Sequence, residues 1–349
     1  MIGIAHAETG AARPLPELVF ALPAHSEQVS GGNIYNHELL RAVAARTRQL
    51  SEPIEHVRAR IERGEPGFYF LDSLNLLDLL TLPPARSGQR YGLIVHHLPS
   101  LEPDRDAGED ALDRERAALA RCDALLATSP FTSEILRLRG VDAKRILTVP
   151  PVALAGEPAQ SINEPFTFCL VSNLIPRKGI RELFEALDAQ LDASDRFHLD
   201  LAGREDIDVD YARSCLETVQ GSQRLSSIVR YLGPVEHDRI AQVYRHASAF
   251  VSAATMETFG MAVQDARAFG LPILGLDGGY VRHHLSNGEN GQLFASSAAL
   301  ASGMLELVRS PQRLRALFAR SQQMRLKSDR SWAHAAESFL RQLAQCVGS

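Results

Sequence analysis

The stretch SAFVSAATMETFGMAVQDARAFGLPILGLDGGY, residues 248–280, contains a complete strand–helix–strand unit. Its apolar runs SAFVSA and LPILGLD are typical of buried strands, and GMAVQDARAFG between them is predicted as a helix. A helix that joins two fully apolar strands is the unit from which covered parallel sheets are built. The stretch therefore predicts an α/β protein with a parallel sheet that carries helices on both faces.

The same alternation continues on both sides of this stretch. Helical spacing is clearest over 179–191, where apolar residues recur at i, i+3, i+4 and i+7. The segment 129–140 is predicted as a helix that begins after an N-capping Ser129 and ends at Gly140. The segment 32–50 is predicted as one further helix. The apolar runs predicted as strands in the N-terminal half are 17–23, 67–72, 91–96, 123–128 and 145–150.

Periodicity lapses between the two halves, at 151–165, where PVALAGEPAQSINEP contains three prolines. We interpret this segment as a linker. The sequence then predicts two Rossmann-like domains that face each other across a cleft, over 15–155 and 163–328. The remaining residues, 329–349, contain the amphipathic segment SWAHAAESFLRQLAQ without a following strand, and they are predicted as a C-terminal helix.

Composition limits the class of protein. The 349 residues suit two domains better than one or three. Apolar residues at 45% and charged residues at 23% exclude wholesale disorder, and a net charge of −5 argues against nucleic-acid binding. Four separated cysteines without a CxxC pair predict reduced thiols in place of disulfides or a zinc site. Because no apolar run reaches membrane-spanning length and the frayed N-terminal lead-in lacks a secretory signal, we expect a cytoplasmic protein.

Polar residues that follow predicted strands are the candidate site, because parallel sheets bind ligands at the carboxyl ends of their strands. His96 and His97 follow the strand YGLIV, and spacing alone leaves open which of them faces the cleft. Strand capping or solvent exposure is the alternative for each. Gly31 and Gly32 open a helix, where a phosphate can approach backbone N–H groups, with a plain tight turn as the alternative.

Two cations, Arg177 and Lys178, precede the predicted helix 179–191. Because like charge opposes the helix dipole at this end, their placement favours diphosphate binding over a solvated pair.

Glu257 stands at the mouth of a strand, and Asp265 follows two turns into the next helix, at most about 12 Å away at about 1.5 Å per residue. This separation suits one carboxylate on the hexose and the other on the ribose of a nucleotide sugar. A capping glutamate and a surface aspartate are the alternative. The amides predicted to face a phosphate between them belong to Thr258, Phe259, Gly260 and Met261.

With these residues assigned, the sequence resembles the retaining GT-B glycosyltransferases of family 4, the glycogen-synthase-like group (glycosyl transferases group 1). The resemblance covers about residues 15–345 and is strongest over 166–294, where SNLIPRKG, LDLAGRE, VRYLGPV and NGENGQLF follow the family's order of motifs. The family's E-x7-E signature corresponds to Glu257 and Asp265. The resemblance implies a GT-B fold, in which the C-terminal helix crosses back to the N-terminal domain.

The resemblance also implies roles for individual residues. Glu257 is expected to contact the donor sugar, Asp265 the ribose and Lys178 the diphosphate. Gly31 and Gly32 match the loop beside the phosphates and the acceptor.

His97 is our first choice for the histidine that contacts the donor, and His96 is the second. The other donor contacts that we expect are Asn173, Arg177 and the amides of Thr258, Phe259, Gly260 and Met261.

The sequence departs from the family pattern at three positions. Ser172–Asn173 replaces the usual Gly-Arg, so the phosphate arginine is missing and Arg177 is the candidate substitute. Asp265 is one methylene shorter than the usual glutamate, and Arg282 occupies a position where the family often carries glutamate.

The implied activity is transfer of a sugar, with retention, from a UDP-, GDP- or ADP-linked donor to a small-molecule, glycan or lipid-linked acceptor. No cofactor or metal is expected, and the D-x-D spacings of 205–211 are interpreted as a solvated or capping loop. Acceptor contacts are expected from the loops 24–37, 72–78 and 97–110. Three arginines in the segment 32–50 suggest at most transient membrane contact.

Two alternatives remain open from the sequence. One is a nucleotide-sugar-binding protein without turnover, which the replacement by Asn173 motivates. The other is a GT-B epimerase that acts on a nucleotide sugar.

Overall fold

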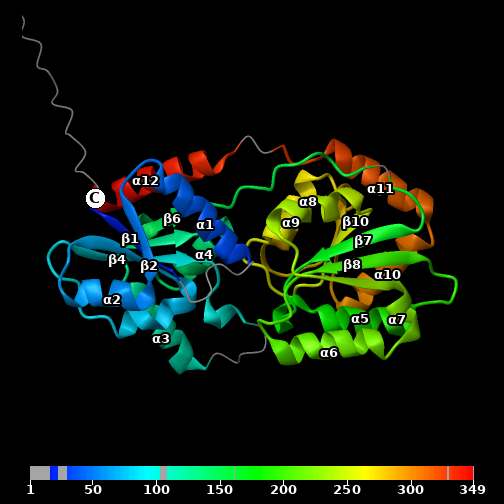
Figure 1. Cartoon of the computed structure of the whole chain (residues 1–349), viewed down its shortest axis with the longest axis horizontal. Helices are drawn as coiled ribbons and strands as arrows, with labels where there is room; N and C mark the ends of the chain where they lie inside the picture. Colours follow the sequence, from blue (N-terminus) through cyan, green and yellow to red (C-terminus); the bar gives the residue numbers. More distant parts are fainter. Residues whose placement is uncertain (1–15, 23–29, 103–107, 161, 328–329, 349) are drawn as a thin grey trace, which may run out of the picture.

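The computed structural model describes residues 16–22, 30–102, 108–160, 162–327 and 330–348. These residues form two parallel sheets of six strands each, which lie side by side along the long axis of the molecule (Figure 1). This architecture confirms the predicted α/β class with two Rossmann-like units. The predicted N-terminal lead-in and parts of the predicted acceptor loops, at 23–29 and 103–107, lie outside the described residues.

The N-terminal sheet has the strand order β2-β1-β3-β4-β5-β6. Its strands are β1 (Leu18–Leu22), β2 (Gln49–Pro53), β3 (Gly67–Asp72), β4 (Gln89–Val95), β5 (Ala124–Ala127) and β6 (Ile146–Thr148). Its helices are α1 (Gly31–Ala44), α2 (Ile54–Glu62), α3 (Glu109–Ala120) and α4 (Pro130–Leu138), with short 3-10 helices η1 (Ser73–Leu80), η2 (Pro99–Leu101) and η3 (Ala143–Arg145). Every residue of β3 and β5 is buried, as predicted for strands that are covered on both faces.

The C-terminal sheet has the order β12-β11-β10-β7-β8-β9. Its strands are β7 (Phe166–Val171), β8 (Phe197–Ala202), β9 (Val229–Gly233), β10 (Ala249–Ser252), β11 (Ile273–Leu276) and β12 (Gly291–Phe294). The surrounding helices are η4 (Pro176–Lys178), α5 (Ile180–Gln190), α6 (Val209–Gln220), α7 (Gln223–Ile228), α8 (His237–His246), α9 (Met261–Ala268), η5 (Gly279–His284), α10 (Ser297–Val308) and α11 (Pro311–Gln323). The quoted stretch 248–280 thus forms β10, α9 and β11, the unit that it predicts.

The helix predicted over 32–50 is shorter than expected. It runs from Gly31 to Ala44, and residues 49–53 form β2, an edge strand that pairs only with β1 in the described sheet. The sequence QLSEP has no apolar run because an edge strand leaves much of its surface exposed to water. Apolar periodicity therefore could not reveal it. By contrast, the helix predicted after Ser129 is confirmed, with the Ser129 hydroxyl accepting from the amide of Thr132.

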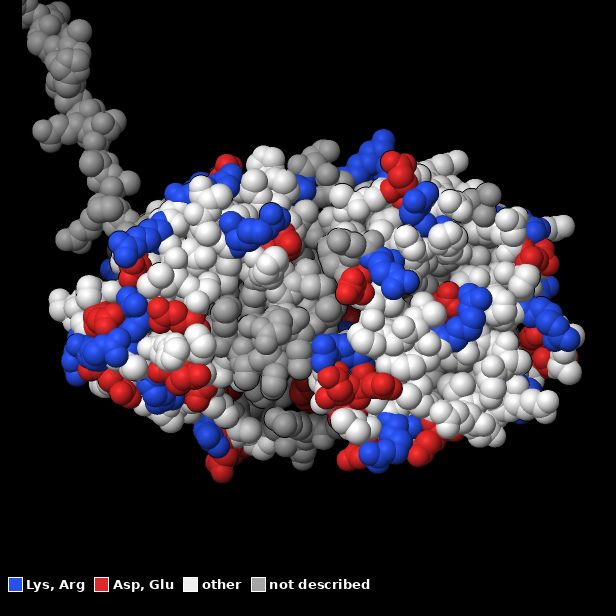
Figure 2. Space-filling view, in the orientation of Figure 1, with Lys and Arg blue, Asp and Glu red and all other residues white. Residues whose placement is uncertain are grey.

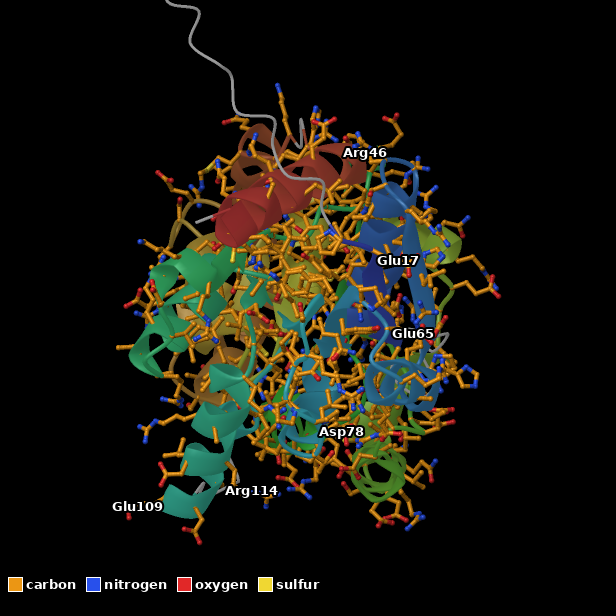
Figure 3. All side chains as sticks on the ribbon, turned by 90° about the vertical axis from the view of Figure 1, so that its left-hand side faces the viewer. Glu17, Arg46, Glu65, Asp78, Glu109 and Arg114 are labelled. Carbon is orange, nitrogen blue, oxygen red and sulfur yellow. The ribbon has the colours of Figure 1, made fainter. Side chains whose placement is uncertain are left out.

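The last helix, α12 (Trp332–Gly348), returns to the N-terminal domain and packs along α1, which confirms the predicted crossing (Figure 1). Phe339 is fully buried, with its ring centroid 5.6 Å from that of Phe70. Arg46, labelled beside this helix in Figure 3, pairs with Glu337 at 2.9 Å. The N-terminal core thus contains side chains from both ends of the chain.

Charges of both signs are interspersed over the face shown in Figure 2. In the described part of the chain, no helix combines the length and apolar character needed to cross a bilayer.

Replacement of Phe339 by alanine is expected to detach α12 from the N-terminal core, because the lost ring leaves a cavity beside Phe20 and Phe70. We expect a loss of about 3–5 kcal/mol in the free energy of unfolding. Trp332, the single tryptophan, begins α12 with its ring 5.6 Å from Tyr35, so its fluorescence during urea denaturation reports the docking. The exposed Arg341→Ala change on the same helix is the control, and equal stability of the two variants would contradict the prediction.

Candidate active site

Two loops at the carboxyl ends of β7 and β10 bring Lys178 and Glu257 together. Nζ of Lys178 lies 2.5 Å from Oε1 of Glu257, and the two side chains are only 15% and 14% exposed. The backbone amide and the hydroxyl of Thr255 both donate to the carbonyl of Arg177, at 3.0 and 3.1 Å, and join the loops. A Cβ on Gly179 would clash with the carbonyl oxygen of Ala253, so glycine is required for this close approach.

Burial and pairing act on both charges of this ion pair. Burial lowers the pKa of Lys178, while Glu257 opposes this shift. For Glu257, burial raises the pKa, but the charges of Lys178 and Arg177 outweigh burial and hold the pKa below its usual value. The carboxylate of Glu257 therefore stays ionised beside a partly desolvated ammonium group.

Two helix N-termini meet at the boundary between the domains. A Cβ on Gly31, the first residue of α1, would lie 3.5 Å from the sulfur of Met261, the first residue of α9. Within the described chain, the amides of Thr258, Phe259, Gly260 and Met261 donate no hydrogen bond. Free amides and the positive ends of two helix dipoles make this boundary a favourable place for an anion.

The structure places both histidines at the domain boundary, in different surroundings. Nε2 of His97 lies 3.1 Å from Glu102 without forming a well-directed hydrogen bond. Burial, with Arg177 and Lys178 nearby, lowers the pKa of His97 to about 4, so its ring is neutral at neutral pH. His96 faces the N-terminal domain, where its Nε2 lies 2.9 Å from Oδ1 of Asn36.

Gly32 has a contact that the sequence did not predict. A Cβ at this position would lie 3.3 Å from the His96 ring, so the missing side chain makes room for the imidazole. Close approach of a phosphate is therefore not needed to explain this glycine.

Thr258, the residue after Glu257, makes two hydrogen bonds that connect the two domains. The Thr258 hydroxyl donates to the carbonyl of His96 at 2.7 Å, and the hydroxyl of Ser129 donates to the carbonyl of Thr258 at 2.6 Å. Ser129 is also the N-cap of α4, so its hydroxyl both caps the start of a helix and contributes to the domain contact.

Asp265 lies on α9 against the linker. Its Oδ1 accepts from the amide of Leu154 at 2.7 Å, and burial raises the pKa of the carboxyl to about 7. The side chain also lines a cavity of about 700 Å³ between the domains, together with Ile34 and Trp332. In this structure, the carboxyl predicted to contact ribose thus makes a hydrogen bond to the linker.

Other residues that the sequence analysis named do not take part in the ion pair and have partners of their own. Oδ1 of Asn173 accepts from the amide of Arg204 at 3.1 Å and holds the turn after β8. Nε of Arg177 lies 3.8 Å from Glu102, across the domain boundary. Arg282 forms a double hydrogen bond with Asp277 on the surface.

The acidic segment 205–211 acts as a helix cap, in line with its interpretation from sequence. The Asp208 carboxylate accepts from the amide of Tyr211 at the start of α6. Among the residues that the structure describes, no three His, Cys, Asp or Glu side chains gather closely enough to hold a metal ion.

Sequence reasoning missed Asn36 and Asp72, which both lie next to His96. Asp72 is the last residue of β3 and falls in a loop that we assigned to the acceptor, so its position at the carboxyl end of a strand was the available signal. Asn36 is four residues after Gly32, on the same face of α1, and only the three-dimensional contact singles it out.

The raised pKa of Asp265 predicts a specific pH dependence of stability. The folded protein holds a proton that the unfolded chain, with a pKa of about 4, releases. The resulting stabilisation is complete below pH 4 and is lost as the pH rises through 7. Asp265→Asn, which stays neutral, is therefore expected to raise the melting temperature relative to the parent at pH 8 but not at pH 4.

The control for this pair of pH values is Asp210→Asn, whose side chain is 92% exposed in the same domain. A gain from Asp265→Asn that is equal at both pH values would contradict the prediction.

Comparison with known proteins supports the resemblance to glycosyl transferases group 1 that the sequence indicated. Residues 157–324 match the family described as Glycosyl transferases group 1. A D-inositol 3-phosphate glycosyltransferase from Rhodococcus erythropolis is 32% identical over 139 residues, which cover 39% of this chain and 29% of that protein. The chain spans about half or less of the length of the curated relatives that it matches first.

Solved structures resemble the whole chain. Sucrose-phosphate synthase from Thermosynechococcus elongatus has a TM-score of 0.73 at 18% identity, over 96% of this chain and 100% of that chain. Anabaena HepE, in complex with UDP and glucose, has a TM-score of 0.71 at 16% identity, over 94% of this chain and 99% of that chain. The C-terminal domain of this chain thus matches the glycosyl transferases group 1 family, and the chain as a whole has the GT-B fold.

Proposed function

We propose that this chain transfers a sugar from a nucleoside-diphosphate donor to an acceptor hydroxyl, with retention of the anomeric configuration. The observation that carries the proposal is the meeting of the α1 and α9 N-termini beside the Lys178–Glu257 pair. Negative charge develops on the diphosphate as the sugar departs, and donors fixed in advance stabilise such charge most effectively. Free amides, two helix dipoles and Lys178 supply this positive potential.

In this proposal, the roles follow from position. Lys178 and Arg177 bind the diphosphate, with the amides of residues 258–261 beside them. Glu257 accepts hydrogen bonds from hydroxyls of the donor sugar. Asp265 exchanges its hydrogen bond to the Leu154 amide for one to the ribose, which requires the linker to shift. Gly31 lets the α1 N-terminus approach the phosphates, whereas Gly32 makes room for the His96 ring.

The acceptor proton is proposed to leave with the diphosphate oxygen on the same face of the sugar, so no separate base is required. His97 is neutral at neutral pH and available as a hydrogen-bond partner for the donor sugar. Because the protein's own cations and amides stabilise the leaving group, the proposed reaction needs no metal ion.

The names of similar proteins support the class of substrates. HepE is described with UDP and glucose, which favours a nucleotide-sugar donor with a diphosphate. The Rhodococcus relative is named for D-inositol 3-phosphate, which favours a small polar acceptor. We propose the same two classes for this chain, without committing to one sugar or nucleobase.

One observation favours binding without turnover as a second candidate. The family's phosphate arginine is replaced by Asn173, whose Oδ1 is already engaged by the Arg204 amide. A protein of this kind would bind nucleotide sugars and form no product. Arg177, whose charge acts on Lys178, Glu257 and His97, is the group that would compensate in an active enzyme.

The direct test incubates the chain with UDP-, GDP- and ADP-linked sugars and a panel of small polyol and phosphorylated acceptors, with EDTA present. We expect a glycosylated product with one donor, and Lys178→Ala is expected to lower kcat/KM about 100-fold or more, because one preorganised donor is lost. The exposed Lys144→Ala change is the matched control. Binding without product would favour the second candidate, and donor interconversion without acceptor would indicate an epimerase.

Glu257→Ala separates sugar recognition from nucleotide recognition. We expect UDP, GDP or ADP to bind within about 3-fold of the parent affinity, while discrimination between epimeric donor sugars falls about 10-fold or more, because the lost carboxylate reads sugar hydroxyls. Calorimetric titration with the nucleotide and with two epimeric nucleotide sugars measures both effects. Unchanged discrimination in this variant would remove Glu257 from the sugar site.

A further inference from the structure

Four residues of the N-terminal domain surround the imidazole of His96, and we call them the His96 socket: Gly32, Tyr35, Asn36 and Asp72. Three of them come from one face of α1, at positions i, i+3 and i+4. Asp72 ends the neighbouring strand β3. The socket lies at the carboxyl end of the N-terminal sheet, next to the proposed donor site.

The hydrogen bonds of the socket select one arrangement of the ring. Nδ2 of Asn36 donates to Oδ2 of Asp72 at 2.7 Å, which turns Oδ1 of Asn36 toward His96. Nε2 of His96 lies 2.9 Å from this oxygen and 3.3 Å from Oδ2 of Asp72. Because both neighbours of Nε2 are acceptors, this nitrogen must carry the proton and donate it.

Asp72 is an ionised carboxylate in the protein interior. It is 2% exposed, and burial alone would raise its pKa. His96, the amide of Leu74 and the side chain of Asn36 outweigh burial and hold the pKa of Asp72 below its usual value. Keeping a charge in this place costs stability, so a fully apolar socket would serve folding better.

Packing holds the ring in the same orientation. The ring of Tyr35 meets the His96 ring edge to face, with centroids 5.3 Å apart, and the Tyr35 hydroxyl donates to the carbonyl of Val149 at 2.8 Å. Gly32 has no side chain and so leaves space for the His96 ring. Within the described residues, Nδ1 of His96 has no hydrogen-bond partner, so it is the ring nitrogen available to a ligand.

We propose that Asp72 is a positioning residue of the transfer reaction: together with Asn36, it fixes His96 in the Nε2-protonated form and leaves Nδ1 to accept a hydrogen bond from a substrate hydroxyl. The inference rests on the proposed function, since it assigns a role within that same site. Asp72 does not touch the substrate and acts only through His96.

A double-mutant cycle tests whether Asp72 acts through the histidine. Asp72→Asn keeps the size of the side chain and removes its charge, and we expect kcat to fall about 10- to 100-fold with KM for the donor within about 3-fold. His96→Ala is expected to lower kcat by at least as much. In the His96→Ala background, Asp72→Asn is expected to change kcat less than about 2-fold.

Asp113→Asn is the matched control, because Asp113 lies on α3 of the same domain, outside the expected acceptor loops, with a side chain that is 72% exposed and pairs with Arg116. It is expected to keep the parent kcat. Equal losses from Asp72→Asn in the parent and in the His96→Ala background would overturn the proposal, as would a fully active Asp72→Asn variant.

A second measurement does not depend on turnover. Long-range proton–nitrogen NMR spectra of histidine-labelled protein, assigned with His96→Ala, report which ring nitrogen of His96 carries the proton. We expect the Nε2-protonated form in the parent and in Asp113→Asn, and a mixture of tautomers in Asp72→Asn. A mixture already present in the parent overturns the inference, whereas absence of any product from the parent overturns the proposed function alone.

Discussion

The ion pair between Lys178 and Glu257 is the constraint around which the site is built. Each charge lies on a different loop and is largely removed from water, so neither is stable in this place without the other. Their contact requires the two loops to touch, which only a glycine at position 179 permits. The ion pair therefore forms only when the loops after β7 and β10 lie this close together, and their backbone geometry fixes where its two charges stand. An anionic ligand that binds Lys178 must share it with Glu257, because the two side chains are already paired.

The adjacent histidines illustrate how one strand end can serve two chemical purposes. Burial, with Arg177 and Lys178 nearby, lowers the pKa of His97 and keeps its ring neutral, whereas His96 lies beside the buried carboxylate of Asp72. Successive residues at the end of β4 thus have different electrostatic surroundings. Groups whose environments differ in this way are typical of sites that bind or move protons. This arrangement costs stability, because it keeps the charged carboxylate of Asp72 in the protein interior.

Contacts between the domains converge on the same region. Thr258 receives one hydrogen bond from the N-terminal domain and donates another to it, and it lies next to Glu257 in sequence. The linker contacts Asp265, about one turn into α9, while α12 returns the chain to the core around Phe70 and Phe339. Relative movement of the domains therefore alters the surroundings of the residues that we assign to the donor.

The sequence by itself determined the architecture, because buried parallel strands and amphipathic helices have periodicities that depend only on local burial. It also singled out Lys178, Glu257 and the two histidines, since each follows a strand and parallel topology brings strand ends together. The edge strand β2 escaped because exposure removes the apolar signal. Tertiary structure alone decided which partner each histidine contacts, that Asp265 contacts the linker, and that Asn36 and Asp72 lie next to His96. Those outcomes depend on side-chain contacts between segments distant in sequence, and no local pattern encodes the distance between them.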